Sequence, residues 1–337
     1  MHCLIFGAGF ICRQHYLAVL AQLCDFIIVV DPEFKNLDFI SEIQEILGDH
    51  VSYRLISDVR DFKIPDTIDH AFILTNHKSH YPLAKYCIDK RIKHIFIEKP
   101  AVLEAYNWNE LLKNSNNLGV KLWPGYHHHN TTLNELSGML DEPLLAHDIE
   151  RIDIFFTRGR IPQRSWGKSF TSKSLSSGGC GVDLGPHVMS IISSIVPDIA
   201  NYTLEVRECS FSNSCNESIS EVDTGLKFTG TYRIPNIQIS ATISYDLLNN
   251  NKPRKIHFKQ KNRLKEDVVW IESSLFKGNR QITLSPDRTD LAFRKMIYDF
   301  LDGKDCQYQK LVMWNIECIE KLYASCGIKI SDNIRVK

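Results

Sequence analysis

The fold is decided by residues 2–12, which read His-Cys-Leu-Ile-Phe-Gly-Ala-Gly-Phe-Ile-Cys. Residues 3–6 form an apolar run of strand length, and apolar residues with helical spacing follow the two glycines. Glycines between a strand and a helix permit a tight turn at Gly7 and let a phosphate approach the backbone at Gly9. The helix N-terminus then offers free N–H groups to the anion. The third small residue of this pattern is Cys12, where helix and strand must pack closely.

The rest of the first third of the chain alternates short apolar runs with helical patterns. Parallel strands that are buried on both faces read as continuous apolar runs, and helices form the crossovers between them. We therefore predict a doubly wound α/β domain over residues 1–125. Further strands are expected at residues 26–30, 71–74, 94–97 and 120–123, and helices at residues 11–23, 37–47, 81–89 and 104–116.

After Gly125 the pattern changes to longer strands with period-two alternation, separated by turn clusters. This change predicts a second, α+β domain over residues 126–337, built on a mostly antiparallel sheet. Strands are expected at residues 152–158, 202–211, 225–232, 237–245, 255–261 and 267–272, and helices at residues 182–195, 287–301 and 310–325.

The composition is that of an ordinary globular protein. The 337 residues include 40 basic and 40 acidic side chains, so net charge indicates neither nucleic acid nor an anionic membrane as a partner. Ten cysteines without a CxxC pair predict free thiols in a reducing compartment. The first strand is followed at once by the glycine turn, which leaves no room for a secretory leader, and no aliphatic run could span a bilayer. We therefore expect a cytoplasmic protein.

Three polar segments allow more than one interpretation. The triplet His127-His128-His129 suggests a metal site, but neighbouring side chains on a strand point to opposite faces, so we expect no metal there. The basic stretch 252–265 is interpreted as the wet face of a strand, with a phosphate-bearing ligand as the alternative. The loop 159–177 is either a solvated loop or the rim of a substrate cleft, in which Trp166 would stack on a sugar and Arg164 would meet a phosphate.

Asp31 ends the second predicted strand, 22 positions after Gly9. A carboxylate at about this offset binds the hydroxyls of an adenosine ribose and repels a 2′-phosphate. Pro32 follows, so no arginine is placed beside it for such a phosphate. These residues favour NAD over NADP, and an ordinary strand-end turn is the alternative role for Asp31.

Three further segments complete the pattern: Thr75-Asn76-His77-Lys78-Ser79-His80, Glu98-Lys99-Pro100, and residues 178–187, Gly-Gly-Cys-Gly-Val-Asp-Leu-Gly-Pro-His. With the glycine turn, they resemble the Gfo/Idh/MocA family of glucose–fructose oxidoreductase and inositol dehydrogenase, over nearly the whole chain. The resemblance implies an N-terminal Rossmann domain with bound NAD(P), and a second domain with an open sheet that binds substrate and mediates oligomerisation. It also implies hydride exchange at a hydroxyl of a sugar, nucleotide sugar or cyclitol. The predicted cofactor-binding residues are Gly7, Gly9, Phe10, Ile11, Asp31, Thr75, Asn76, His80, Glu98 and Lys99.

The resemblance assigns catalysis to Lys99, Asp183 and His187, and the chemistry of these residues agrees with it. Asp183 and His187 are four positions apart, which places them on one face of a helix. An imidazole is suited to accept the hydroxyl proton near pH 7, and the Lys99 ammonium favours a developing alkoxide. The predicted substrate-binding residues are Lys99, Tyr126, His128, Arg164, Trp166, Asp183 and His187.

Some positions depart from the family pattern and leave the substrate open. Ser190 stands where the family often has an aspartate, and the histidine triplet stands where it often has an arginine. Two other functions keep the same cofactor: imine reduction or redox-neutral chemistry with NAD recycled, and dinucleotide sensing without turnover. An antiparallel sheet can pack only one face on its own domain. The resemblance implies that the other face meets another subunit, so a homo-oligomer, a dimer or tetramer, is expected.

Overall fold

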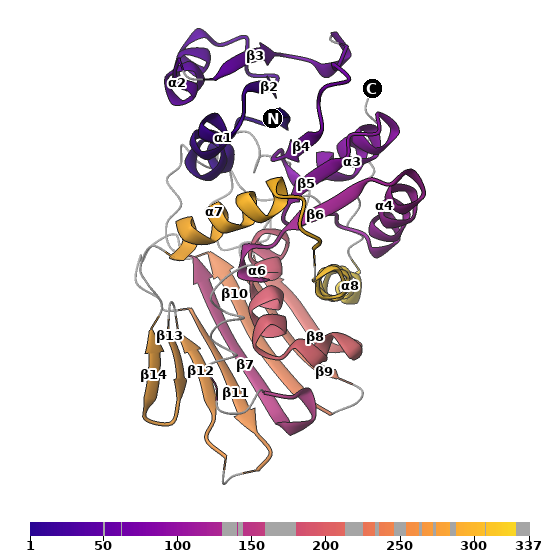
Figure 1. Cartoon of the computed structure of the whole chain (residues 1–337). Helices are drawn as coiled ribbons and strands as arrows, with labels where there is room; N and C mark the ends of the chain where they lie inside the picture. The colour runs from indigo at the N-terminus through magenta and orange to yellow at the C-terminus, as the bar shows by residue number, and fades with distance from the viewer. Residues whose placement is uncertain are drawn as a thin grey trace.

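The structure is a computed structural model in which two β-sheets lie one above the other, with helices around the first and between the two (Figure 1). It describes residues 1–49, 51–61, 63–129, 140, 144–158, 180–212, 225–232, 236–245, 254–262, 265–271, 274–283, 288–306 and 308–327. The predicted fold class, a parallel α/β sheet followed by a mostly antiparallel one, is confirmed. Within the described residues, no helix is long and apolar enough to cross a membrane.

The first sheet contains six parallel strands in the order β3-β2-β1-β4-β5-β6. This order reverses between β1 and β4, and ligands of doubly wound sheets bind at the carboxyl ends of the strands at such a reversal. The strands are β1 (His2–Phe6), β2 (Phe26–Val30), β3 (Ser52–Ile56), β4 (His70–Ile73), β5 (His94–Glu98) and β6 (Lys121–Gly125).

Helices cover both faces of this sheet because every central strand is apolar on both sides. One face packs on a helix that runs from Phe10 through a π-helical segment η1 (Cys12–Tyr16) into α1 (Leu17–Leu23), and on α2 (Leu37–Leu47). The other face packs on α3 (His80–Asp89) and α4 (Ala105–Leu118). Cys12 is fully buried in the first of these cores, as close packing of helix on strand requires.

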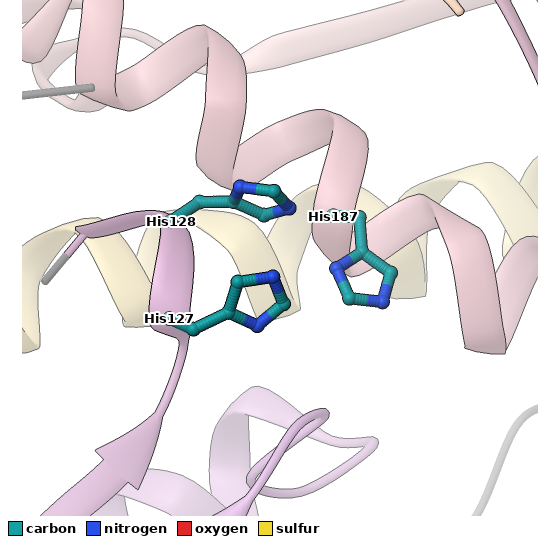
Figure 2. A group of neighbouring side chains, drawn as sticks. All are labelled: His127, His128 and His187. Atoms are coloured by element: carbon teal, nitrogen blue, oxygen red, sulfur yellow. The ribbon is translucent and has the colours of Figure 1, made fainter. Parts of the chain in front are cut away.

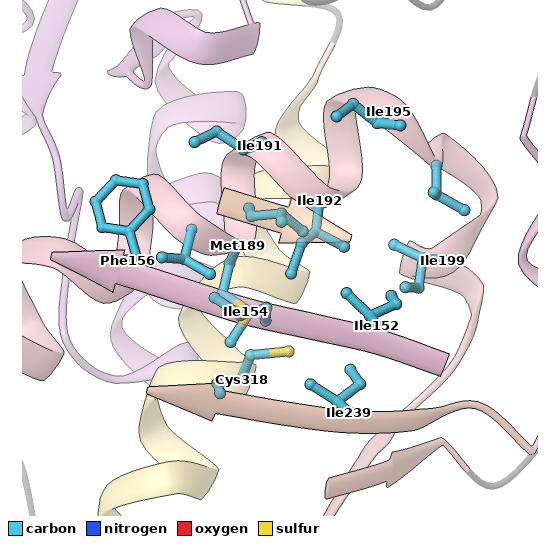
Figure 3. Packing of buried hydrophobic residues seen from close by; sticks show 14 of the residues in the cluster. Ile152, Ile154, Phe156, Met189, Ile191, Ile192, Ile195, Ile199, Ile239 and Cys318 are labelled. Atoms are coloured by element: carbon cyan, nitrogen blue, oxygen red, sulfur yellow. The ribbon is translucent and has the colours of Figure 1, made fainter. Parts of the chain in front are cut away.

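The second sheet contains eight strands in the order β14-β13-β12-β11-β7-β10-β9-β8, with one parallel pair, β7 and β10. The strands are β7 (Ile149–Arg158), β8 (Leu204–Ser212), β9 (Gly225–Tyr232), β10 (Gln238–Tyr245), β11 (Lys255–Gln260), β12 (Val268–Ile271), β13 (Ser274–Lys277) and β14 (Arg280–Thr283). Helix α6 (Cys180–Ile195) lies across one face, where isoleucines of β7 meet Met189, Ile191 and Ile192 (Figure 3).

Two C-terminal helices pack against the sheets, one of them against both. Helix α7 (Arg288–Leu301) adds Phe293, Met296 and Phe300 to the core of the parallel sheet. Helix α8 (Gln309–Ser325) places side chains such as Ile316 in the first domain and others such as Ile319 in the second. We retain residues 1–125 and 126–337 as the proposed domains, with the closing helices packed on both.

Candidate active site

The centre of the site is an ion pair between the two domains. Lys99 follows β5, and its Nζ donates hydrogen bonds to Asp183 Oδ1 at 2.7 Å and to the Asp183 carbonyl at 3.1 Å. The two side chains are 14% and 16% exposed, so the pair is shielded but open on one side. The sequence-predicted lysine and aspartate, 84 positions apart, are therefore brought together.

Helix α6 presents Asp183 and His187 on a single face. Between residues 181 and 196 these are the only positions that are not buried. The opposite face of the helix carries Gly181 and Gly185, and a Cβ on either would meet a side chain of α8 at 2.4 Å. The glycines let α8 approach α6 closely. Asp183 and His187 each lie two residues after one of these glycines, so they project from the opposite side of α6, toward the first domain.

A buried carboxylate, that of Glu98, accepts a hydrogen bond from the backbone amide of Lys99. Glu98 is 6% exposed; one of its oxygens accepts a 2.6 Å hydrogen bond from the Tyr16 hydroxyl, and the other accepts a 2.7 Å bond from the Lys99 amide. Burial raises the pKa of Glu98 and raises that of Tyr16 well above its usual value. Glu98 was predicted to bind cofactor; its present contacts hold the backbone of Lys99, and the peptide bond from Lys99 to Pro100 is cis.

His80 braces the ends of β4 and β5. Its ring is 1% exposed and lies 2.8 Å from the Pro100 carbonyl and 3.0 Å from the Thr75 carbonyl. Burial lowers the pKa of His80 to about 4, so near neutral pH the ring donates to one of the two carbonyls at a time. Its predicted role in cofactor binding is thus an indirect one, through the two loops.

Tyr126 has a similar supporting position. This residue was predicted to bind substrate, but its side chain is 2% exposed and its hydroxyl accepts a 3.4 Å hydrogen bond from the Ala101 amide. The tyrosine holds the chain just after Lys99 and Pro100 rather than lining an open cleft. Thr75 and Asn76, in contrast, end β4 beside this region with partly exposed side chains, as the prediction of a cofactor-facing loop requires.

The glycine turn fits a dinucleotide phosphate. Gly7 has φ +88°, and a Cβ there would lie 2.9 Å from the Leu74 carbonyl, so only glycine suits the turn. A Cβ on Gly9 would meet nothing within 4 Å, so this glycine is not required by packing and its open side is available to a ligand. The amides of Phe10 and Ile11 belong to the first helical turn, where no preceding carbonyl receives them.

Asp31 closes the turn from β2. Its Oδ2 accepts a 2.7 Å hydrogen bond from the Ala8 amide, and its Oδ1 accepts a 2.9 Å bond from the Glu33 amide. The carboxylate thus has a structural function that was considered only as an alternative in the sequence. Each oxygen retains a second lone pair, which is what a ribose hydroxyl would use.

The histidine triplet departs from expectation. Residues 127–129 form a 3₁₀ turn, η4, and the assumption that they lie on a strand is wrong. His127 and His128 turn their rings toward His187 of α6 (Figure 2), with ring centroids 5.2 and 5.3 Å from that of His187. His129 is buried elsewhere, 3.0 Å from the Ser194 hydroxyl. His127 is therefore a site residue that sequence reasoning missed, since its direction depends on the turn.

Ser190 and the loop before α6 complete the list of predicted residues. Ser190 is 1% exposed, and its hydroxyl donates to the Pro186 and His187 carbonyls, so it faces the helix and not a substrate. Arg164 and Trp166 lie outside the described residues. Residues 255–260 of the basic stretch form β11, where exposed Lys255 and Lys259 alternate with buried residues, as on the solvated face of a strand.

Comparison with known proteins identifies the first domain by sequence and the whole fold by structure. Residues 1–126 match the family GFO_IDH_MocA, described as an oxidoreductase family with an NAD-binding Rossmann fold. A comparison of the sequence with curated proteins finds no match.

Solved structures match over almost the whole chain. The 3-ketoreductase KijD10 from Actinomadura kijaniata, in complex with NADP and TDP-benzene, has a TM-score of 0.73 at 14% identity, covering 98% of both chains. The scyllo-inositol dehydrogenase from Lactobacillus casei, with NAD(H) and scyllo-inositol, has a TM-score of 0.70 at 13% identity, covering 96% of both. The UDP-N-acetylglucosamine 3-dehydrogenase GnnA from Acidithiobacillus ferrooxidans has a TM-score of 0.68 at 13% identity, covering 96% of this chain and 97% of that one.

At these identities the likeness establishes a common fold. The family match identifies the first domain, and the structural likeness extends the common fold to the second domain. Residues 1–126 are thus those of a Gfo/Idh/MocA NAD-binding Rossmann domain, and the chain has the fold of the solved structures named above.

Proposed function

We propose that this protein is an NAD-dependent oxidoreductase that exchanges hydride between the nicotinamide and a hydroxyl-bearing carbon of a sugar, nucleotide sugar or cyclitol. The observation that carries the proposal is the 2.7 Å pair between Lys99 and Asp183, with His187 one helical turn further along α6. Lys99 and Asp183 thus meet at the carboxyl edge of the parallel sheet, and His187 follows Asp183 on the same face of α6.

Each of the three side chains has a distinct task. The bound nicotinamide supplies the hydride chemistry. The His187 imidazole accepts the hydroxyl proton during oxidation and returns it during reduction. The Lys99 ammonium stabilises negative charge on the reacting oxygen, and the Asp183 carboxylate holds that ammonium in place. Glu98 and Tyr16 fix the backbone below Lys99, so the amine is positioned before substrate arrives.

Proteins of the same fold support the proposed substrate class. They include a 3-ketoreductase in complex with TDP-benzene and NADP, a UDP-N-acetylglucosamine 3-dehydrogenase and a scyllo-inositol dehydrogenase. A screen of sugars, cyclitols and nucleotide sugars, followed through the absorbance of the reduced nicotinamide, tests the proposal. Turnover without net formation of reduced nicotinamide would instead favour redox-neutral chemistry, and cofactor binding without turnover would favour a sensor.

Lys99→Ala is expected to reduce kcat/KM by about 100-fold or more, because it removes the ammonium group that stabilises negative charge on the reacting oxygen. The matched control is Lys85→Ala, which removes an exposed lysine paired with Glu110 on the surface of the first domain. Full activity of Lys99→Ala, with the control also fully active, would remove the catalytic assignment.

Asp31 is proposed to set the preference for NAD over NADP. Asp31→Asn keeps the size of the side chain and one oxygen that can accept from the Ala8 amide, and it loses the acceptor for the Glu33 amide. It removes the charge that repels a 2′-phosphate. We expect the ratio of kcat/KM with NAD to that with NADP to fall by about tenfold, which corresponds to about 1.4 kcal/mol. The measurement uses one substrate with both cofactors, and an unchanged ratio would leave Asp31 with its structural function alone.

We also propose a homo-oligomer, assembled through the face of the second sheet that α6 does not cover. On β7 the buried Ile152, Ile154 and Phe156 alternate with residues on this other face, among which Phe155 is 40% exposed. An exposed phenylalanine in the middle of an eight-stranded sheet supports burial against another subunit.

A further inference from the structure

The three-histidine cluster, formed by His127, His128 and His187, has the geometry of a metal-ion site. One ring nitrogen from each residue can be chosen so that all three lie within 4.8 Å of one another. The planes of the rings are inclined to each other by 41°, 58° and 84°, so the rings approach from different directions instead of stacking (Figure 2). Three donors that converge from different directions are what a coordination sphere requires.

Little movement is needed to bind an ion. A tetrahedral Zn²⁺ with Zn–N bonds of about 2.0–2.1 Å places its nitrogen ligands about 3.3 Å apart. The present spacing of up to 4.8 Å is reduced to this value when each nitrogen moves by less than about 1 Å, which rotation of an imidazole about its Cβ–Cγ bond supplies.

The donor set selects the kind of ion. Three imidazoles without a carboxylate are suited to zinc, nickel, cobalt or copper, whereas calcium and magnesium prefer oxygen ligands. All three side chains are only partly buried, so an ion and its hydrating water can reach them. With three protein ligands, the fourth position of a tetrahedral ion remains open for water. The nearby Lys99 charge is already balanced by Asp183 at 2.7 Å, which limits its repulsion of a cation.

We propose that the three-histidine cluster binds a divalent transition-metal ion such as Zn²⁺, and that the bound ion inhibits the enzyme by occupying the imidazole of His187. A nitrogen that binds the ion cannot accept the substrate's proton, because both use the same lone pair. The inhibitory part rests on the proposed function, whereas metal binding does not.

The binding part is tested on the untagged, metal-free protein by titration with Co²⁺, whose tetrahedral complexes absorb in the visible, followed by competition with Zn²⁺. We expect one equivalent to saturate the wild type. His127→Ala and His128→Ala should each weaken binding by about tenfold or more, because each removes one of three ligands. The matched control is His147→Ala, an exposed histidine beside Asp148, which should bind like the wild type.

A second replacement at His127 distinguishes loss of a metal ligand from loss of folding. His127→Gln keeps a polar side chain of similar length, so loss of the cobalt spectrum with unchanged thermal unfolding identifies loss of a ligand. Absence of a cobalt spectrum in the wild type, or equal binding by the wild type and all cluster variants, would overturn the metal site.

The inhibitory part is tested by assaying turnover with Zn²⁺ and then with a chelator. We expect reversible inhibition of the wild type and of His147→Ala, and at least tenfold weaker inhibition of His127→Ala relative to its own metal-free rate. Metal binding without inhibition would overturn the inhibitory role. If no substrate is turned over at all, the proposed function fails, while the cobalt titration still decides the metal site.

Discussion

At the scale of single residues, His70 makes the fold sensitive to acid. This side chain in β4 is 8% exposed, stacks on His94 at 4.7 Å and meets the edge of Phe300. Among the described residues neither of its ring nitrogens has a hydrogen-bond partner. Burial lowers the pKa of His70 from 6.5 to about 4, so the folded protein holds this ring neutral where an unfolded chain would protonate it.

Between pH 6.5 and 4 the unfolded state therefore binds one more proton at this position, and stability falls as the pH is lowered through that window. At about 1.4 kcal/mol for each tenfold change in proton affinity, the loss reaches about 3 kcal/mol at pH 4. His70→Phe should keep the ring stacking and make urea unfolding less dependent on pH in this window. The control is exposed His147→Phe; equal slopes for wild type and His70→Phe would contradict the assignment.

At the scale of elements, the contact between α6 and α8 determines where the catalytic face points. A Cβ on Gly181 would lie 2.4 Å from the Tyr323 hydroxyl and 2.8 Å from two of its ring carbons, and Tyr323 is fully buried. A buried ring cannot turn aside, so an alanine at this position must push α6 away from α8. Because α6 carries Asp183, such a shift also lengthens the pair with Lys99.

Gly181→Ala is expected to lower the free energy of unfolding by about 1–3 kcal/mol, the usual cost of overpacking, and to lower kcat together with it. Urea denaturation and steady-state kinetics measure the two effects. Gly9→Ala is the control for stability, since a Cβ there meets nothing within 4 Å. A Gly181→Ala protein as stable and active as the wild type would show that α8 does not constrain α6.

Helices and strands whose apolar residues recur at regular spacing were predicted from the sequence, and those without such spacing were not. The central strands of the first sheet and helix α6 were found because their apolar residues repeat regularly. Strand β3 was missed because its edge position leaves every residue at least partly exposed. Strands β13 and β14 were missed because each has only four residues, too few to show a period.

For the site, Lys99, Asp183 and His187 were identified from the sequence because their motifs have a fixed order. Their contact could not be derived, since a distance across 84 positions depends on tertiary packing. The buried positions of His80, which begins α3, and of Tyr126, which follows β6, were not predicted, because polar residues at the ends of such elements are usually exposed. His127 joins the site only through a 3₁₀ turn, which three consecutive histidines do not signal.

At the scale of the whole molecule, the face of the second sheet that α6 does not cover is where assembly is expected. Phe155→Glu places a charge in the middle of this face and should shift the protein toward monomers in size-exclusion chromatography with light scattering. Tyr106→Glu, which changes an aromatic residue that is 76% exposed on α4, is the matched control. A wild-type protein that is monomeric, or an assembly unaffected by Phe155→Glu, would contradict the proposed interface.

The position of α7 and α8 also affects how the protein is made. Translation delivers the six-stranded sheet first, yet Phe293, Phe300 and Ile316 complete its core and are synthesised more than 160 residues after its last strand, which ends at Gly125. The core of the eight-stranded sheet likewise includes Leu322 and Tyr323, which are synthesised after all of its strands. Both halves of a nascent chain therefore leave the ribosome with uncovered apolar faces, and we expect them to require chaperone protection until those last helices emerge.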